Sequence, residues 1–112
     1  MKLFHRTWEG ERILREGFRD GRGKYLTGET HQGVWFSGFP LNDDARPGDT
    51  LLEIEMPENV AVGYEWLEEG KNYREFLIPA ALANSYGPPR QVPSAEEAEM
   101  PDPRFPEEDP RI

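Results

Sequence analysis

The sequence predicts a small α+β domain with one or two short helices. The chain has 112 residues, enough for one hydrophobic core and too few for a second. Hydrophobic residues make up only 36% of the chain, so this core must be small, and aromatic residues at 12% supply much of its area. Short alternating apolar runs recur along the chain, whereas a long amphipathic helical pattern does not occur.

The first third of the chain predicts a strand, a helix and a loop. Residues 2–7 alternate between apolar and polar side chains, which is typical of a strand. Residues 8–18 predict a short helix, because acidic residues occupy its first turn and Gly17 can end it. Residues 20–33 combine several glycines and charges with little apolar content, so we expect a mobile loop there.

The middle of the chain predicts strands separated by turns. A loop is expected over 41–49, with a turn at Pro47-Gly48. Pro79 is well placed to begin a single helical turn over 79–84. The four strands expected in this region are 34–36, 51–56, 60–66 and 73–78.

Residues 88–112 differ from the rest in composition. They hold seven of the 11 prolines and seven acidic against three basic residues. Such a segment buries too little apolar surface to offset its ordering entropy, so an acidic, largely disordered tail is expected, with residues 1–87 as the folded domain. A solubilising role is the plain interpretation of this tail. The alternative is an arm that covers the domain or binds a partner, anchored by Phe105 and Ile112.

Composition also excludes several classes of site. The net charge of −9 argues against tight binding of nucleic-acid phosphates over a broad face, while a local basic groove stays compatible with it. The chain has no cysteine, which excludes disulfides and thiolate chemistry, and its two histidines exclude a histidine-rich metal site, so no metal is expected. Its apolar runs are too short to span a membrane, and its first residues turn polar too early for a signal peptide, so a cytoplasmic protein is expected.

Three residues stand out as candidates for a site. His5 lies inside the first expected strand, Trp35 lies in an aromatic strand that follows a glycine, and Glu75 opens a late apolar strand. Each has an ordinary structural interpretation. A strand histidine is often a core residue bonded to a backbone carbonyl, a tryptophan is often core, and such a glutamate often faces solvent from an edge strand.

The order of four segments adds a family resemblance that covers about residues 3–79. These segments resemble the ADP-ribosyltransferase superfamily, and they are most similar to its diphtheria-toxin-like branch, which carries a His-Tyr-Glu set. The resemblance implies a split β-sheet of ADP-ribosyltransferase type. The segments are Phe4-His5-Arg6-Thr7, Ile13-Leu14-Arg15-Glu16-Gly17-Phe18, Gly33-Val34-Trp35-Phe36-Ser37 and Tyr73-Arg74-Glu75-Phe76-Leu77-Ile78-Pro79.

The resemblance implies NAD as the substrate and gives each residue a role. His5 matches the histidine that hydrogen-bonds the adenine-side ribose. Glu75 matches the catalytic glutamate that bonds the nicotinamide ribose 2′-hydroxyl and stabilises the oxocarbenium-like transition state. Thr7 matches a small hydroxyl residue, whereas Arg6 replaces the family's glycine and Trp35 its tyrosine. A fixed carboxylate suits a positive charge that develops only as the glycosidic bond breaks, and an aromatic wall suits the flat nicotinamide ring.

The resemblance also carries two geometric expectations. The side chains of His5, Trp35 and Glu75 should converge on one cleft between two small sheets. The glycine-rich residues 20–32 should border this cleft as a lid, with Tyr25 able to swing onto a bound ring.

The resemblance implies NAD-dependent ADP-ribosyl transfer, a glycosyltransferase reaction, or NAD glycohydrolysis where water is the acceptor. The acceptor class is open. Arginine is disfavoured, because Tyr73 stands where arginine-modifying members carry a second Glu or Gln. One alternative is NAD-dependent RNA 2′-phosphotransfer, and another is a non-catalytic binding module whose pocket Arg6 and Trp35 fill. The phosphotransferase would need a local basic patch, for which the candidates are Arg6, Arg12, Arg15, Arg19, Arg22 and Lys24.

Overall fold

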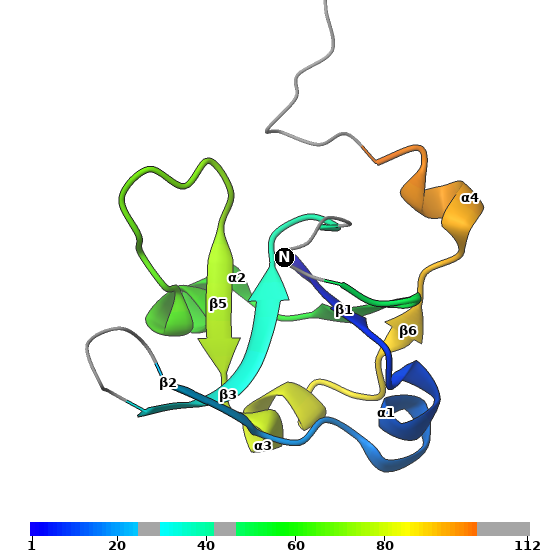
Figure 1. Cartoon of the computed structure of the whole chain (residues 1–112), viewed down its shortest axis with the longest axis horizontal. Helices are drawn as coiled ribbons and strands as arrows, with labels where there is room; N and C mark the ends of the chain where they lie inside the picture. The colour runs from blue at the N-terminus through cyan, green and yellow to red at the C-terminus, as the bar shows by residue number, and fades with distance from the viewer. Residues whose placement is uncertain (25–29, 42–46, 101–112) are drawn as a thin grey trace, which may run out of the picture.

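A computed structural model describes residues 1–24, 30–41 and 47–100, with the side chains of 22–24 and 30–31 left out of the description. The protein is a small α+β domain built on an antiparallel sheet (Figure 1). In chain order its elements are β1 (Lys2–Thr7), α1 (Gly10–Glu16), β2 (Gly21–Lys24), β3 (Thr30–Ser37), β4 (Thr50–Glu55), α2 (Glu58–Ala61), the 3-10 turn η1 (Val62–Tyr64), β5 (Glu75–Ile78), α3 (Ala80–Asn84), β6 (Arg90–Gln91) and α4 (Ser94–Glu97).

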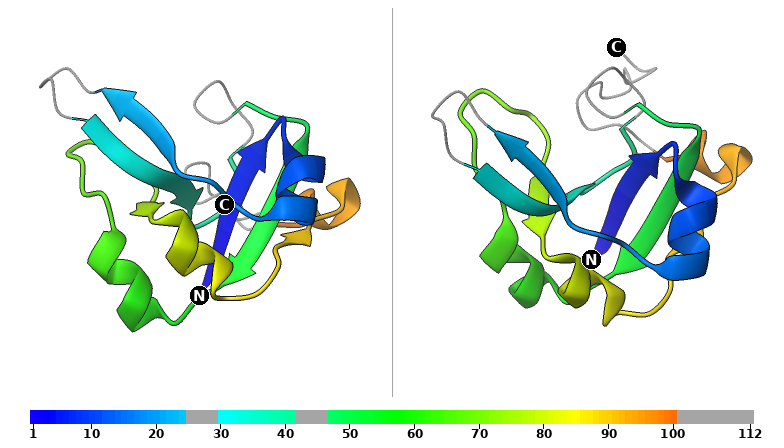
Figure 2. Two further views of the ribbon diagram at one scale, coloured as in Figure 1. Left: turned by 90° about the horizontal axis from the view of Figure 1, so that it is seen from below. Right: turned by 60° about the horizontal axis from the view of Figure 1, so that its bottom comes forward.

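The sheet separates around its central strand. The strand order is β2-β3-β1-β4-β6, and β5 pairs with β3 outside this path. β1 pairs with β4 along its whole length, from Lys2 opposite Glu55 to Thr7 opposite Thr50. By contrast, the register between β1 and β3 is a single pair, Phe4 opposite Ser37. Beyond that pair the two strands diverge, as Figure 2 shows.

Different parts of the chain pack against the two faces of the sheet. The core face carries Leu3 and Phe36, and residues of α1, α2 and α3 pack against it (Figure 2). The main core on this face consists of Leu3, Ile13, Phe18, Val34, Phe36, Leu52, Ile54, Met56, Ala61, Phe76, Ile78, Ala80 and Ala83. On the other side, which we call the tail face, Phe4 and Leu51 form a smaller cluster with Val92 from the end of the chain.

Several expected elements are confirmed. Strand β1 and helix α1 form where alternation and Gly17 predicted them, and Gly17 takes a positive φ of 87° with its N–H bonded to the carbonyl of Ile13. The strands expected over 51–56 and 73–78 correspond to β4 and β5, and α3 follows Pro79. The described part of the chain has four short α-helices, more than the one or two expected.

The strand expected over 60–66 is wrong. Residues 60–64 are helical, forming the end of α2 and then η1, and only Glu65 makes a strand-type bridge, to Phe76. Pro57 precedes the first turn with a φ of −55°, and the N–H groups of Val60 and Ala61 both bond its carbonyl. A helical turn buries Ala61 completely in the core, and that burial outweighs the preference of the neighbouring valines for a strand.

The loop expected over 20–33 is also largely wrong. Strands β2 and β3 pair from Gly21 opposite Gly33 to Lys24 opposite Thr30. Backbone pairing needs no apolar side chains, which is why composition failed to indicate it. A Cβ on Gly33 would lie 3.1 Å from the carbonyl oxygen of Ile78, and its φ is 153°, so this position requires glycine. Tyr25 lies outside the described residues.

The domain boundary expected at residue 87 moves toward the C-terminus. Residues 90–91 form β6 on the edge of β4, and residues 94–97 form α4. Val92 is buried against Phe4 and Leu51, and its N–H bonds the Leu51 carbonyl at 2.9 Å. Val92 therefore anchors residues 90–92 to the sheet, although the composition of residues 88–112 predicted disorder. Phe105 and Ile112 lie outside the described residues.

Candidate functional site

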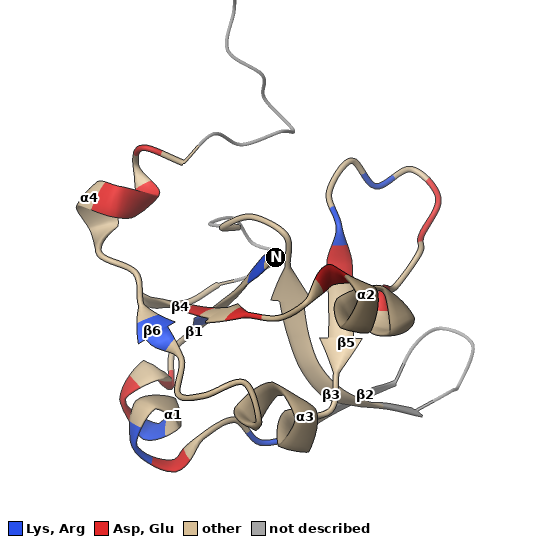
Figure 3. Ribbon diagram, turned by 180° about the vertical axis from the view of Figure 1, so that it is seen from behind, with Lys and Arg blue, Asp and Glu red and all other residues tan. Residues whose placement is uncertain are grey.

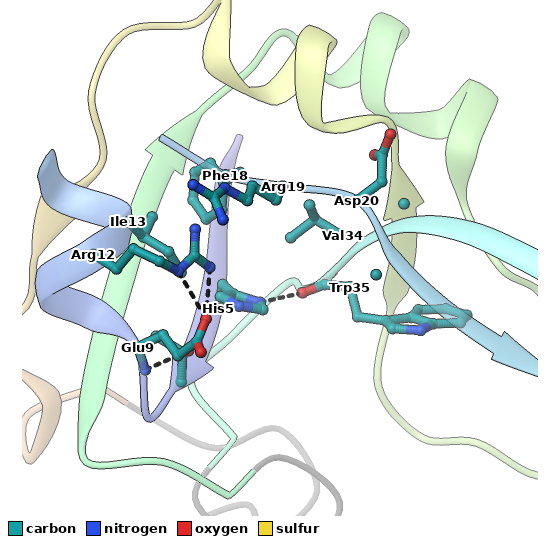
Figure 4. Close-up of a pocket in the computed structure, with 12 residues that line it drawn as sticks. His5, Glu9, Arg12, Ile13, Phe18, Arg19, Asp20, Val34 and Trp35 are labelled. Carbon is teal, nitrogen blue, oxygen red and sulfur yellow. Dashed lines mark hydrogen bonds and ion pairs between the residues drawn. The ribbon is translucent and has the colours of Figure 1, made fainter. Parts of the chain in front are cut away.

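A pocket of about 340 Å³ lies where β1 and β3 diverge, with α1 forming one wall (Figure 4). Such a volume is at the lower end of ligand-binding pockets, large enough for one nucleotide-sized group. We call it the His5 pocket. Its lining residues are His5, Thr7, Glu9, Arg12, Ile13, Phe18, Arg19, Asp20, Gly21, Gly33, Val34 and Trp35.

His5 is held in place by a backbone carbonyl. Its Nδ1 lies 2.7 Å from the carbonyl oxygen of Trp35, across the gap between β1 and β3. Because a carbonyl only accepts, Nδ1 carries the proton and donates this hydrogen bond. The imidazole also meets the rings of Phe18 and Phe36, each at a centroid distance of 5.7 Å. The structural interpretation of a strand histidine bonded to a carbonyl is therefore confirmed, and the same bond fixes the ring at the pocket wall.

Charged residues from α1 and the following segment line the same pocket. Arg12 donates from Nε and Nη2 to one oxygen of Glu9, at 2.9 and 2.6 Å. Thr7 accepts a hydrogen bond from the N–H of Glu9 at 3.0 Å. Asp20 accepts the N–H of Ala80 at 2.7 Å and so ties the pocket to α3. The pocket wall thus carries both signs of charge.

Glu75 lies elsewhere, at the start of β5. It is 2% exposed, and its carboxylate forms an ion pair with Lys71, whose ammonium also lies 2.8 Å from Glu68. The expectation of a solvent-facing glutamate is wrong. A bridge between Glu65 and Phe76 and the pairing of β5 with β3 enclose the strand on both edges.

Strand register puts His5 and Glu75 on opposite faces of the sheet. Directly opposed residues share a face, and neighbours along a strand alternate. Phe4 is opposite Ser37, and Ser37 is opposite Glu75, so Glu75 shares the tail face with Phe4, whereas His5 points to the core face. The expected convergence of three side chains on one cleft is therefore wrong. It failed because sequence spacing does not reveal which face each strand residue takes.

Trp35 contacts residues on both the core face and the tail face of the sheet. Its carbonyl lines the His5 pocket, while its side chain shares the face of Glu75, to which it is a diagonal neighbour across β3 and β5. Its ring packs edge-on against Trp66 with centroids 5.6 Å apart. His5 and Glu75 thus approach the same short stretch of β3 from opposite faces.

A second pocket, of about 390 Å³, adjoins Glu75 through its ion-pair partner, and we call it the Lys71 pocket. It is built by the segment that leads into β5. Its lining residues are Glu65, Trp66, Leu67, Glu68, Lys71, Asn72, Tyr73 and Arg74. Arg74 donates to Glu65 at 2.7 Å, and this hydrogen bond is the main cause that holds the pKa of Glu65 below its ordinary value.

The remaining candidates are dispersed. Thr7 lines the His5 pocket, but Arg6 points to the tail face, where it bonds the Leu41 carbonyl at 2.5 Å and the carboxylate of Glu97. In the basic set proposed for a phosphotransferase, Arg12 and Arg19 line the His5 pocket, and each is paired with a glutamate. The side chains of Arg22 and Lys24 lie outside the part of the chain that the structure describes.

Sequence reasoning missed Lys71 and Trp66. Lys71 is four residues before Glu75, a spacing that indicates contact in a helix but carries no such signal in a turn leading to a strand. The placement of Trp66 follows from the hydrogen bond between its N–H and the carbonyl of Glu75 at 2.8 Å, a long-range backbone contact that has no sequence signature.

Neither a metal site, nor a membrane-spanning helix, nor a match to a known protein adds evidence on function. Among the described residues, no three His, Asp or Glu side chains are grouped so as to hold a metal ion, and no helix is long and apolar enough to cross a membrane. Comparison of the chain with protein-family models, curated proteins and solved structures finds no match in any of the three.

Proposed function

We propose that this domain binds NAD and transfers its ADP-ribose unit to an acceptor, as the motif order resembling ADP-ribosyltransferases implies. The observation that carries the proposal is the position of Trp35, which bonds His5 through its carbonyl and has Glu75 as a diagonal neighbour on its own face. Three candidates far apart in the sequence therefore border one stretch of β3, with His5 on the core face and the side chains of Trp35 and Glu75 on the tail face.

In the proposed reaction, the bond between C1′ of the ribose and the nicotinamide nitrogen breaks, and nicotinamide leaves with the bonding electron pair. Glu75 supplies negative charge as positive charge develops on the ribose, and Trp35 offers a flat wall for the nicotinamide ring. The acceptor atom then bonds C1′ and loses its proton to solvent. Where the acceptor is water, the reaction is NAD glycohydrolysis.

His5 would act in binding. An imidazole whose Nδ1 donates to the Trp35 carbonyl presents a fixed ring to a ribose hydroxyl. The His5 pocket has room for one half of a dinucleotide, in keeping with an adenine-side role for this end.

The test is release of nicotinamide from NAD, measured by chromatography on the full chain alone and with protein or RNA acceptors. We expect release that increases with the right acceptor. NAD binding is measured in parallel by titration calorimetry. A full chain that neither binds NAD nor releases nicotinamide with any acceptor class would overturn the proposal.

A second candidate function is a non-catalytic binding module on the same fold. The burial of Glu75, its ion pair with Lys71 and its placement on the face opposite His5 favour it. NAD binding without nicotinamide release, and without loss of binding in Glu75→Gln, would identify this function.

A further inference from the structure

Arg6 is a largely buried cation on the tail face of the sheet. Its side chain is 10% exposed, and its Nε donates to the Leu41 carbonyl at 2.5 Å. Burial lowers the pKa of Arg6 below its ordinary value, because the surroundings disfavour the charged form. A guanidinium in this position requires an anion, since an unpaired charge away from water is costly.

The anion comes from the other end of the chain. Nη2 of Arg6 forms an ion pair with Glu97 of α4, whose side chain is 22% exposed. Glu97 is thus an intramolecular carboxylate ligand of the Arg6 guanidinium on β1. The Leu41 carbonyl, which lies outside the terminal segment, also holds the guanidinium through Nε.

Helix α4 is a short helix at the edge of the sheet. It has four residues, and no side chain caps its first turn. Its other glutamate, Glu96, pairs with Arg90 of β6 at 2.7 Å, and Arg90 also pairs with Glu53 of β4 at 2.9 Å. Figure 3 shows α4 projecting from the sheet beyond β6, with its acidic residues in red. Val92 anchors the terminal segment before α4, and the partly buried Met100 packs against the same cluster after it. Glu97 therefore leaves Arg6 by a shift of α4 between these two anchors, while β6 stays paired.

A pocket of about 480 Å³ lies between Arg6 and α4. It is lined by Arg6, Ser94, Glu97, Ala98 and Met100. The space beside the ion pair is large enough for a small anion to approach the guanidinium as Glu97 leaves.

We propose that Arg6 is a binding site for a phosphate-class anion, and that Glu97 occupies this site in cis as an autoinhibitory latch. A phosphate oxygen and a carboxylate oxygen offer the same acceptor to a guanidinium, so the two compete for Arg6. Only the identification of the natural ligand as a phosphate of NAD rests on the proposed function. The site and its latch are properties of Arg6, Glu97 and α4.

The test compares the full chain with its Glu97→Gln and Glu99→Gln variants. The two variants change the net charge equally, but Glu99 is exposed and forms none of the ion pairs found among the described residues. Inorganic pyrophosphate is titrated at constant ionic strength and followed by NMR of backbone amides. We expect Glu97→Gln to bind pyrophosphate at least about 10-fold more tightly than the other two proteins, which corresponds to about 1.4 kcal/mol.

Hydrogen exchange gives a readout without any ligand. In Glu97→Gln, amides of residues 96–100 should exchange at least about 10-fold faster than in Glu99→Gln, while the amide of Val92 keeps its protection. The double variant Arg6→Met with Glu97→Gln should lose the gain in pyrophosphate affinity, because the guanidinium is gone.

Equal pyrophosphate affinity in Glu97→Gln and Glu99→Gln, or a gain that survives Arg6→Met, would overturn the inference. NAD is then titrated with the same proteins. If pyrophosphate binding rises in Glu97→Gln while NAD is neither bound nor cleaved by any of them, the anion site stands and the proposed transferase function fails.

Discussion

Glu75 is the residue on which the proposed chemistry depends. We expect Glu75→Gln to reduce nicotinamide release by about 100-fold or more, since a carboxylate facing a developing cation contributes roughly 3 kcal/mol or more to the transition state. NAD affinity should change far less, because that charge is absent in the ground state. Steady-state kinetics and calorimetry on the same preparations measure both.

The structure adds a stability cost to this variant and supplies its control. Neutralising a buried carboxylate removes an ion pair with Lys71, which is itself partly exposed, and we expect this to lower the free energy of unfolding by about 1.5–3 kcal/mol. Glu68→Gln removes the exposed partner of the same lysine and should leave turnover unchanged. If Glu75→Gln retains full turnover per folded molecule, the glutamate is structural and the binding module becomes the leading function.

His5 should show the opposite kinetic pattern. His5→Ala removes the ring that the Trp35 carbonyl holds at the pocket wall, so we expect NAD affinity to fall by about 10-fold or more while the chemical step changes less. Single-turnover kinetics at saturating NAD separate the two effects. A variant with unchanged NAD affinity and reduced chemistry would contradict a binding role for His5.

Among the elements, the approach of the 47–49 segment to β1 is sterically constrained. A Cβ added to Gly48 would lie 2.5 Å from the backbone nitrogen of Thr7, which a side-chain rotation cannot relieve. We expect Gly48→Ala to lower the free energy of unfolding by about 2 kcal/mol or more, measured by denaturant titration. Gly63→Ala is the matched control, because its Cβ would meet nothing within 4 Å. Equal stability of the two variants would show that this close approach is absent.

The link between α2, η1 and β5 should depend on pH. Arg74 bonds Glu65 at 2.7 Å and Glu58 at 3.0 Å, and the hydrogen bond from Arg74 lowers the pKa of Glu65. A carboxylate whose pKa is lower in the folded state adds stability above its ordinary pKa and loses it as pH falls through the lowered value.

We therefore expect Glu65→Gln to destabilise the protein at about pH 7 and to be nearly neutral at about pH 3. The effect should stay below about 1 kcal/mol, because the Arg74 side chain is 42% exposed and water screens the pair. Thermal unfolding of the wild type and the variant across this range measures the difference. An effect of Glu65→Gln that grows as the pH falls would contradict the assignment.

For the whole molecule, the terminal segment 90–100 belongs to the folded unit. Removing it exposes Phe4 and Leu51, which pack against Val92. At about 25 cal/mol per Å² of apolar surface, we expect a chain ending at residue 87 to be less stable than one ending at residue 100 by about 2 kcal/mol or more. Denaturant titration of both chains checks this, and equal midpoints would restore the boundary that composition indicated.

Much of the molecule was decided locally by its sequence. Alternation over residues 2–7 and 51–56 produced β1 and β4, Gly17 ended α1, and Pro79 preceded α3. These features depend on neighbours a few positions away, which is why one sequence sufficed to predict them. The hydrogen bond of His5 to a backbone carbonyl was foreseen for the same kind of reason, since a strand imidazole needs a partner.

Only the tertiary structure decided the arrangement of the site. Register along β3 set His5 and Glu75 on opposite faces, a long-range bridge buried Glu75, and backbone pairing made β2 and β3 from a segment that composition assigned to a loop. The packing of Val92 against Phe4 and Leu51 anchored a terminal segment that composition assigned to disorder. Each outcome depends on which distant strands pair and in which register, and that choice is made by the packing of the whole core, because shifting a strand by one residue exchanges its faces.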